Sequence, residues 1–331
     1  MDILTTLQTL NCCHGPAGDE GEIADKIAEL ARPFADEITR DTLGNLFVHR
    51  KGSGPRVMFA AHMDSIGFIV THIDDKGFLR FGKVGGLRAA SCLHAPVHFK
   101  NGVKGAVVLD CGTEVKDMTL DDLCIDIRAR DRAEAETMVR VGDTAVFDAP
   151  AFAAGERIVS PYLDNRISCV ALLMALERLG ERRNDLWFIF TVQEELGLRG
   201  AKPATYQVEP KYGVVMDVTP AADECGSKHT SSSVLGGGAA IKVMDSSVIC
   251  HPQMVQRLDE LARASGIPAQ RDVIRAGGTD AGAIHASRGG VYTGGISVPC
   301  RYVHAPVEMA DRRDVEACAT LAAAFAQAEL E

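Results

Sequence analysis

The stretch "FIFTVQEELGLRGA", residues 188–201, contains an apolar run that ends in two adjacent acids, Glu194 and Glu195. The run has the length and the composition of a buried strand. Hydrophobic packing does not explain two neighbouring carboxylates at the end of such a strand. Their position raises the question of what the other apolar runs of the chain carry at their ends.

Other strand-like runs also end in polar side chains. The runs in "VMFAAHMD", "GVVMD" and "ISVPCRYVH", and the segment "PYLDNR" before a helix, add the candidates His62, Asp64, Asp217, His304 and Asp164. In open α/β sheets, ligands bind outside the carboxyl ends of the strands. We therefore expect these side chains to meet at one edge of a sheet.

Helix and strand patterns alternate in the parts of the chain that carry these candidates. Amphipathic helices are predicted near residues 18–38, 165–180 and 252–265, and a last helix is predicted near the C-terminus. Strands are predicted near residues 44–50, 56–64, 186–192, 212–217, 239–244 and 290–298. This alternation predicts an α/β fold with a mostly parallel, mixed sheet flanked by helices.

Residues 68–158, which lie between the two halves of this alternating pattern, have a different hydrophobic pattern. Their short alternating runs are separated by turn signals such as "DDKG" and "KNG", with one helical stretch at "DRAEAETMVR". This pattern predicts a β-rich, barrel-like insert. We therefore expect a discontinuous catalytic α/β domain, residues 1–67 and 159–331, and an inserted domain, residues 68–158.

The composition argues against several classes of protein. The formal net charge of -10 comes without a basic block, which disfavours nucleic acid and anionic membranes as partners. The ten cysteines form no CxxC pair, so we interpret them as reduced core residues rather than as a disulfide framework or zinc-thiolate sites. No apolar stretch approaches the roughly 20 residues of a membrane span, and the first residues lack a secretion signal. We expect a cytoplasmic protein.

Each candidate side chain has a simpler explanation when it is taken alone. A single histidine such as His62 or His304 is more often a hydrogen-bonded structural residue than a metal ligand. Asp164, or equally Asn165, fits an ordinary helix N-cap, and Asp217 fits an ordinary strand end. The two glutamates fit a solvated corner.

Taken together, converging acids repel one another and raise each other's pKa unless cations neutralise them. Two divalent ions balance the carboxylates of Asp164, Glu195 and Asp217 plus one bound hydroxide. His62 and His304 add neutral nitrogen ligands. Because five ligands serve two ions, one must be shared, and the two oxygens of Asp164 suit a bridge between metals about 3.5–4 Å apart. Nitrogen and carboxylate ligands without thiolate favour zinc, cobalt or manganese.

The two glutamates then take different roles. Consecutive side chains of an extended segment point in different directions, so Glu195 can bind metal while Glu194 faces the open coordination position. We expect Glu194 to act as the general base, which takes a proton from metal-bound water and passes it to the leaving amine. Asp64 can accept the other N–H of His62 and fix its tautomer, although a surface Asp fits the same spacing equally well.

The motifs "AAHMDSIG", "YLDNR", "VQEELGLRGA", "VVMDVTP" and "RYVHAPVE" together resemble those of the M42 family of dinuclear metallo-aminopeptidases. This group contains glutamyl, leucyl and deblocking aminopeptidases and includes tetrahedral ones. The resemblance runs across nearly the whole chain in the expected order and implies a zinc-peptidase-like sheet. It also implies that His62 and Asp217 bind one metal, Glu195 and His304 the other, and Asp164 both.

The resemblance implies further properties. It places Thr279 and Asp280 near the substrate, and it implies a dimer through the inserted domain, assembly up to dodecamers, and active sites that face an internal cavity. Two positions depart from the family pattern, since many members have Glu in place of Ser65 and a second Asp in place of Asn165. Neither departure falls on a predicted ligand, so they bear on residue preference and metal affinity rather than on the reaction type.

The leading hypothesis is hydrolysis of the first peptide bond of short peptides, with Glu194 activating a water that bridges two metals. Within the same chemistry, a co-catalytic metallo-carboxypeptidase or a deacylase of N-acylated amino acids is the alternative. An endoglucanase, a label carried by some M42 proteins, normally needs two carboxylates and no metal. The non-enzyme alternative is a shell or binding protein that has lost catalysis.

Overall fold

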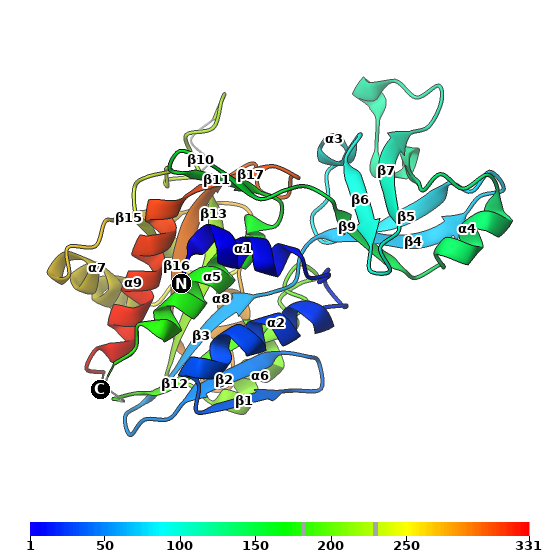
Figure 1. Ribbon diagram of the computed structural model, residues 1–331. Helices are drawn as coiled ribbons and strands as arrows, with labels where there is room; N and C mark the ends of the chain where they lie inside the picture. Colours follow the sequence, from blue (N-terminus) through cyan, green and yellow to red (C-terminus); the bar gives the residue numbers. More distant parts are fainter. Residues whose placement is uncertain (181–182, 228–230, 331) are drawn as a thin grey trace.

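A computed structural model of the chain describes residues 1–180, 183–227 and 231–330. It consists of a large sheet flanked by helices and a smaller closed barrel that lies beside the sheet (Figure 1). Both termini lie in the larger part. The predicted fold class, a mixed α/β sheet with a barrel-like insert, is confirmed.

Among the residues that the structure describes, the large sheet has eleven strands. Its main path runs through β1 (Glu37–Arg40), β2 (Leu46–Arg50), β12 (Asp185–Thr191), β3 (Arg56–His62), β13 (Tyr212–Pro220), β16 (Tyr292–Arg301), β17 (Glu308–Asp311), β11 (Arg157–Ser160) and β10 (Phe152–Ala154), and β14 (Ala239–Met244) and β15 (Ala269–Val273) branch from β16. The neighbours β12, β3, β13 and β16 pair in parallel, whereas both edges pair antiparallel. Parallel pairing is therefore confined to the centre, together with the β14–β15 branch.

The central strands are buried because helices cover them. Strand β3 is buried from Val57 to His62, and Phe59 stacks on Phe188 of β12 with ring centroids 5.0 Å apart. A run buried at consecutive positions needs cover on both faces of the sheet. That cover comes from α5 (Leu163–Glu177) with α9 (Arg312–Gln327), and from α6 (Ala201–Val208) with α8 (Ala281–Ile284).

The described stretches of the larger part also contain the α-helices α1 (Ile3–Asn11), α2 (Gly21–Ala31) and α7 (Pro252–Ala264). The sequence did not predict α1 or α6. The stretch of α1 carries three threonines, and α6 contains Pro203, which a helix tolerates in its first turn. Packing against the rest of the protein, which buries Leu7 and Leu10 of α1, outweighs these weak local preferences.

The barrel is closed by six strands in the order β4, β5, β8, β7, β6, β9. They are β4 (Gly67–Ile73), β5 (Leu79–Val84), β6 (Pro96–Phe99), β7 (Lys104–Leu109), β8 (Leu123–Asp126) and β9 (Thr144–Phe147), with the short helices α3 (Ala89–Cys92) and α4 (Arg132–Met138). The barrel has its own core, in which Phe68 packs edge-on against Phe81 and Phe147. The domain boundaries at residues 68 and 158 stay a prediction.

The strand register opens a space at the carboxyl end of the sheet. Strand β13 pairs with β3 only as far as Val215, opposite Ala60, but it pairs with β16 as far as Pro220. Beyond Val215, β3 and β13 therefore separate. Asp217 leaves from inside β13, not from its end as the sequence predicted, because the pairing with β16 continues the strand for three more residues.

Among the described residues, no helix is both long enough and apolar enough to cross a membrane.

Candidate metal centre

Five parts of the chain bring the predicted side chains to the space where β3 and β13 separate. His62 is the last residue of β3, Asp164 lies at the start of α5, and Asp217 leaves from within β13. Glu195 and His304 lie in the segments that follow β12 and β16. All five predicted ligands line one cavity of about 430 Å³.

Asp164 lies between the two histidines. Its Oδ1 is 3.1 Å from His62 Nε2, and its Oδ2 is 3.2 Å from His304 Nε2. Each carboxylate oxygen thus faces a different imidazole, which is the arrangement that a bridging ligand requires.

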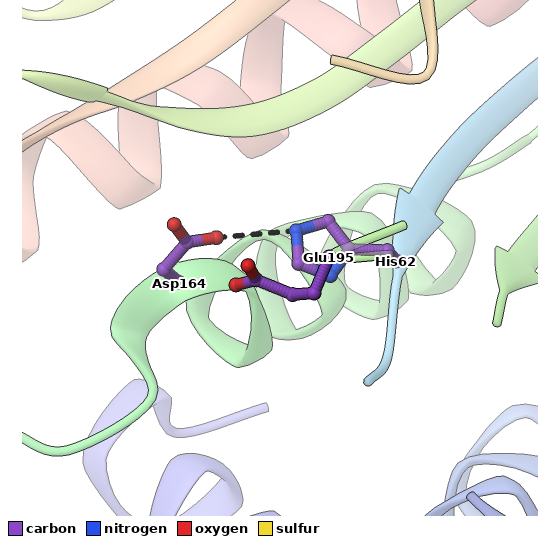
Figure 2. A group of neighbouring side chains, drawn as sticks. All are labelled: His62, Asp164 and Glu195. Atoms are coloured by element: carbon purple, nitrogen blue, oxygen red, sulfur yellow. Dashed lines mark hydrogen bonds and ion pairs between the residues drawn. The ribbon is translucent and has the colours of Figure 1, made fainter. Parts of the chain in front are cut away.

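The remaining acids divide between the same two histidines. Glu195 Oε1 lies 3.1 Å from His304 Nε2, and Asp217 Oδ1 lies 3.7 Å from His62 Nε2. One ligand atom each from His62, Asp164 and Glu195 lie within 4.8 Å of one another, close enough to belong to one metal centre. Figure 2 shows these three side chains converging.

Both imidazoles have the orientation that metal ligands need. The Nδ1–H of His62 donates to the carbonyl oxygen of Asp64 at 3.1 Å, and that of His304 donates to the carbonyl oxygen of Gly86 at 3.0 Å. Both Nε2 atoms therefore face carboxylate oxygens about 3 Å away, a distance at which two acceptors repel unless a cation or a proton lies between them. The donor set therefore fits divalent metal.

Protons take the place of a cation when no metal is bound. Burial opposes protonation of His304, but Asp164 and Glu195 raise its pKa to about 11. Burial also opposes protonation of His62, but Glu194 and Asp164, among others, raise its pKa well above the ordinary value. Because an imidazolium has no free lone pair, binding of metal must release these protons.

Glu194 lies beside the predicted ligands. Its Oε2 is 3.8 Å from His62 Nε2. Burial raises the pKa of Glu194 well above its ordinary value, and the charges of Asp217 and Asp280 raise it further against the effect of His62. A buried carboxyl group with a raised pKa is suited to accept and return a proton.

Asp64 is fully buried and touches both glutamates through their main chain. Its two carboxylate oxygens accept the N–H groups of Glu194 at 3.0 Å and Glu195 at 3.2 Å. Its carboxylate also lies 3.5 Å from His62 Nδ1, farther than its own carbonyl oxygen. The simpler interpretation of Asp64, a surface residue, is therefore wrong.

Thr279 and Asp280 differ in their position. Thr279 lines the cavity, and its hydroxyl donates to Asp245 at 2.9 Å. Asp280 is buried and accepts a hydrogen bond from the Thr191 hydroxyl at 2.5 Å, and it is not among the residues that line the cavity. Their role in substrate binding stays a prediction.

Sequence reasoning missed Glu308. Its two carboxylate oxygens accept the main-chain N–H groups of Asp164 at 2.9 Å and His304 at 2.7 Å. Burial, together with the charge of Asp164, raises the pKa of Glu308 well above its ordinary value. The signal was an acid four residues after His304, at the end of "RYVHAPVE".

The rest of the cavity wall is apolar. Besides glycine and alanine, its side chains outside the centre and Thr279 are Leu198, Val218, Pro220, Ile274 and Val303. A larger hollow of about 850 Å³ lies beside the barrel, where Lys100 pairs with Asp19. It contains none of the predicted ligands, so the smaller cavity is the candidate active site.

The fold and this centre define a metal-dependent peptidase. The family model for M42 glutamyl aminopeptidase matches residues 44–321. The chain belongs to the M42 family and is a metal-dependent aminopeptidase, which confirms the resemblance of its motifs.

Individual proteins agree with this assignment. A relative from Acetivibrio thermocellus, provisionally named an aminopeptidase, is 46% identical over 315 residues, which are 95% of each chain. An aminopeptidase structure from the archaeon Desulfurococcus kamchatkensis has a TM-score of 0.94 and 38% identity, over 98% of this chain and 94% of that one. The TET1 peptidase of Pyrococcus horikoshii can assemble into a tetrahedron or a large octahedral shell. Its structure has a TM-score of 0.88 and 32% identity, over 98% of this chain and 99% of that one.

Proposed function

We propose that this aminopeptidase uses two divalent metal ions per chain to remove N-terminal residues from short peptides. His62 and Asp217 would hold one ion, Glu195 and His304 the other, and Asp164 both. The observation that carries this proposal is the pair of 3.1 and 3.2 Å contacts from the two oxygens of Asp164 to two different imidazoles. Zinc or cobalt suits these ligands best, and manganese is the next candidate.

Bound metal supplies Lewis acidity at the scissile carbonyl and lowers the pKa of water. The protein residues do the rest. Glu194 accepts a proton from the attacking water and returns it to the leaving amine, while Asp64 holds the main chain of Glu194 and orients His62. The acids of the centre attract the free α-amine of the substrate.

The apolar cavity wall supports a preference for apolar N-terminal residues. A charged side chain would lose its water against Leu198, Val218 and Ile274, which costs several kcal/mol without a polar partner. We expect kcat/KM for leucyl or methionyl substrates to exceed that for glutamyl and lysyl substrates by at least about tenfold.

A panel of aminoacyl p-nitroanilides, free and N-acetylated, tests this function in the presence of added zinc, cobalt or manganese. Cleavage of the free substrates alone supports an aminopeptidase. Cleavage of acylated amino acids alone would instead favour the deacylase, and release of C-terminal residues from peptides would favour the carboxypeptidase.

We also propose that the chain forms a homo-oligomer in the cytoplasm, with a dimer formed through the barrel and assembly up to a tetrahedral dodecamer. The capacity of the Pyrococcus horikoshii relative to form closed shells supports this proposal. Light scattering on the purified protein tests it, and a monomer at micromolar concentration would contradict it.

A further inference from the structure

One loop of the barrel reaches into the candidate metal centre. Residues 85–88 follow β5 and precede α3, and Gly86 lines the active-site cavity. This short segment contacts His304, Val303 and Glu195. We call residues 85–88 the barrel loop.

Two hydrogen bonds tie the barrel loop to the His304 segment. The carbonyl oxygen of Gly86 accepts the Nδ1–H of His304 at 3.0 Å, which leaves Nε2 free to bind metal. The guanidinium of Arg88 donates to the carbonyl oxygen of Val303 at 2.9 Å. Together they fix both the ring and the main chain of this predicted ligand.

The packing is close enough to require glycine at both positions. A Cβ at residue 86 would lie 2.5 Å from His304 Nδ1, well inside van der Waals contact. A Cβ at residue 85, where φ is +77°, would lie 2.8 Å from Glu195 Oε2 and 2.7 Å from Ile66 Cγ2. The barrel loop thus packs directly on two predicted ligands of the same ion.

The His304 segment depends on such outside contacts. Tyr302 and His304 both have positive φ, at 61° and 66°, a backbone conformation that costs roughly 1 kcal/mol or more for residues other than glycine. Glu308 holds the main chain of His304 from one side, and the barrel loop holds its ring from the other.

The other subsite is positioned differently. The Nδ1–H of His62 donates to the carbonyl oxygen of Asp64, two residues along its own chain segment. The Asp217 carboxylate accepts the N–H of the next residue, Val218, at 2.8 Å. These contacts come from the large sheet and its flanking loop, not from the barrel.

We propose that the barrel loop, through Gly86 and Arg88, is a positioning element for one metal subsite, the one formed by His304 and Glu195. The inserted barrel then has a role within its own chain besides association, because its placement sets the affinity for one of two ions. This inference rests on the proposed two-metal centre.

Metal titration of the stripped, full-length protein tests the inference. Isothermal titration calorimetry with zinc or cobalt should show two ions binding to the wild type. In Gly86→Ala, one ion should bind within about threefold of its wild-type affinity. The other should bind about 10–100-fold more weakly, because the added Cβ pushes the His304 ring away from the main-chain carbonyl that orients it, and loss of a ligand's hydrogen-bond partner usually has an effect of this size. Arg88→Ala, an exposed change that keeps Gly86, should weaken the same ion by a smaller factor.

Gly289→Ala is the matched control, because a Cβ at that position meets nothing within 4 Å, and both of its affinities should be unchanged. Unchanged affinities in both Gly86→Ala and Arg88→Ala would overturn the inference, as would equal weakening of the two ions in both variants. A wild type that binds fewer than two ions would contradict the two-metal proposal itself. The two failures are therefore distinguishable.

Discussion

Glu194 and Glu195 are adjacent in the chain, but their surroundings give them different chemistry. Glu195 Oε1 faces His304 Nε2 at 3.1 Å, whereas Glu194 Oε2 stands 3.8 Å from His62 Nε2. Burial raises the pKa of both carboxyls, and it raises that of Glu194 well above the ordinary range. The first glutamate suits proton transfer and the second suits ion binding.

Replacement of Glu194 separates these two roles. We expect Glu194→Gln to keep a metal content close to wild type but to lower kcat by roughly two or more orders of magnitude, because an amide cannot accept the proton of the attacking water. Metal analysis and kinetics on the same preparation measure both quantities. The control Glu195→Gln should lose metal as well as activity, and near-normal turnover by Glu194→Gln would remove the proposed base.

Glu20 provides a pH-dependent prediction. It is buried and accepts the N–H groups of Gly18 at 2.8 Å and Gln193 at 3.1 Å. Burial, with a contribution from the charge of Asp64, raises the pKa of Glu20 from 4.5 to about 7. Because the folded state favours the neutral form, its stabilising effect is complete below the unfolded pKa and is lost as pH rises through about 7.

The variant Glu20→Gln should therefore gain stability relative to wild type as pH increases. Between about pH 5.5 and about pH 8.5 we expect the difference in unfolding free energy to shift by roughly 2 kcal/mol in favour of the variant. Thermal or urea denaturation of both proteins at the two pH values measures it. A difference in unfolding free energy that is constant with pH would show that ionisation of Glu20 does not destabilise the folded state.

At the level of elements, the sequence predicted which side chains lie at the ends of the central strands. It did not predict the contacts that position these side chains. His62 and Glu195 were accessible because apolar runs and their ends are local patterns. The supporting contacts of Gly86 and Glu308 join residues 218 and 144 positions apart in the chain, a separation that no local periodicity reveals. The continuation of β13 past Asp217 likewise depends on pairing with β16, a non-local partner.

Glu308 gives an element-level prediction, since it ties the start of α5 to the loop after β16. A glutamine has only one acceptor oxygen, so Glu308→Gln leaves either the Asp164 or the His304 N–H without its partner. We expect metal affinity to fall by about 10–100-fold. Calorimetric titration measures it, with the exposed Glu316→Gln as control, and an unchanged affinity would contradict this positioning role.

At the scale of the whole molecule, the sequence predicted a sheet and a barrel because the two parts have different hydrophobic patterns. Long apolar runs alternate with helices in one part, whereas the other part consists of short runs of alternating apolar and polar residues. It predicted less well how far the sheet is parallel, because the antiparallel edge strands are short. The metal centre lies where the two parts meet, between the strand ends of the sheet and residues 85–88 beside the barrel.

Removal of metal should therefore weaken the whole fold. An ion present at 100 times its dissociation constant stabilises the folded state by about 2.7 kcal/mol. When the ion is removed, the carboxylates of the centre are no longer neutralised and repel one another. We expect chelator-treated protein at mildly alkaline pH to unfold at a temperature several degrees lower, and added zinc to restore it. Scanning calorimetry measures the change, and an unaltered transition would argue against a resident cation.

We infer that these acids are tolerated together because cations lie among them and that the same cations drive peptide hydrolysis. Metal counting and leucyl p-nitroanilide hydrolysis on one preparation, before and after exhaustive demetallation, test this inference. We expect close to two ions per chain at the start, a loss of more than about a hundredfold in rate without them, and recovery on adding zinc or cobalt. Undiminished hydrolysis by metal-free protein would contradict it.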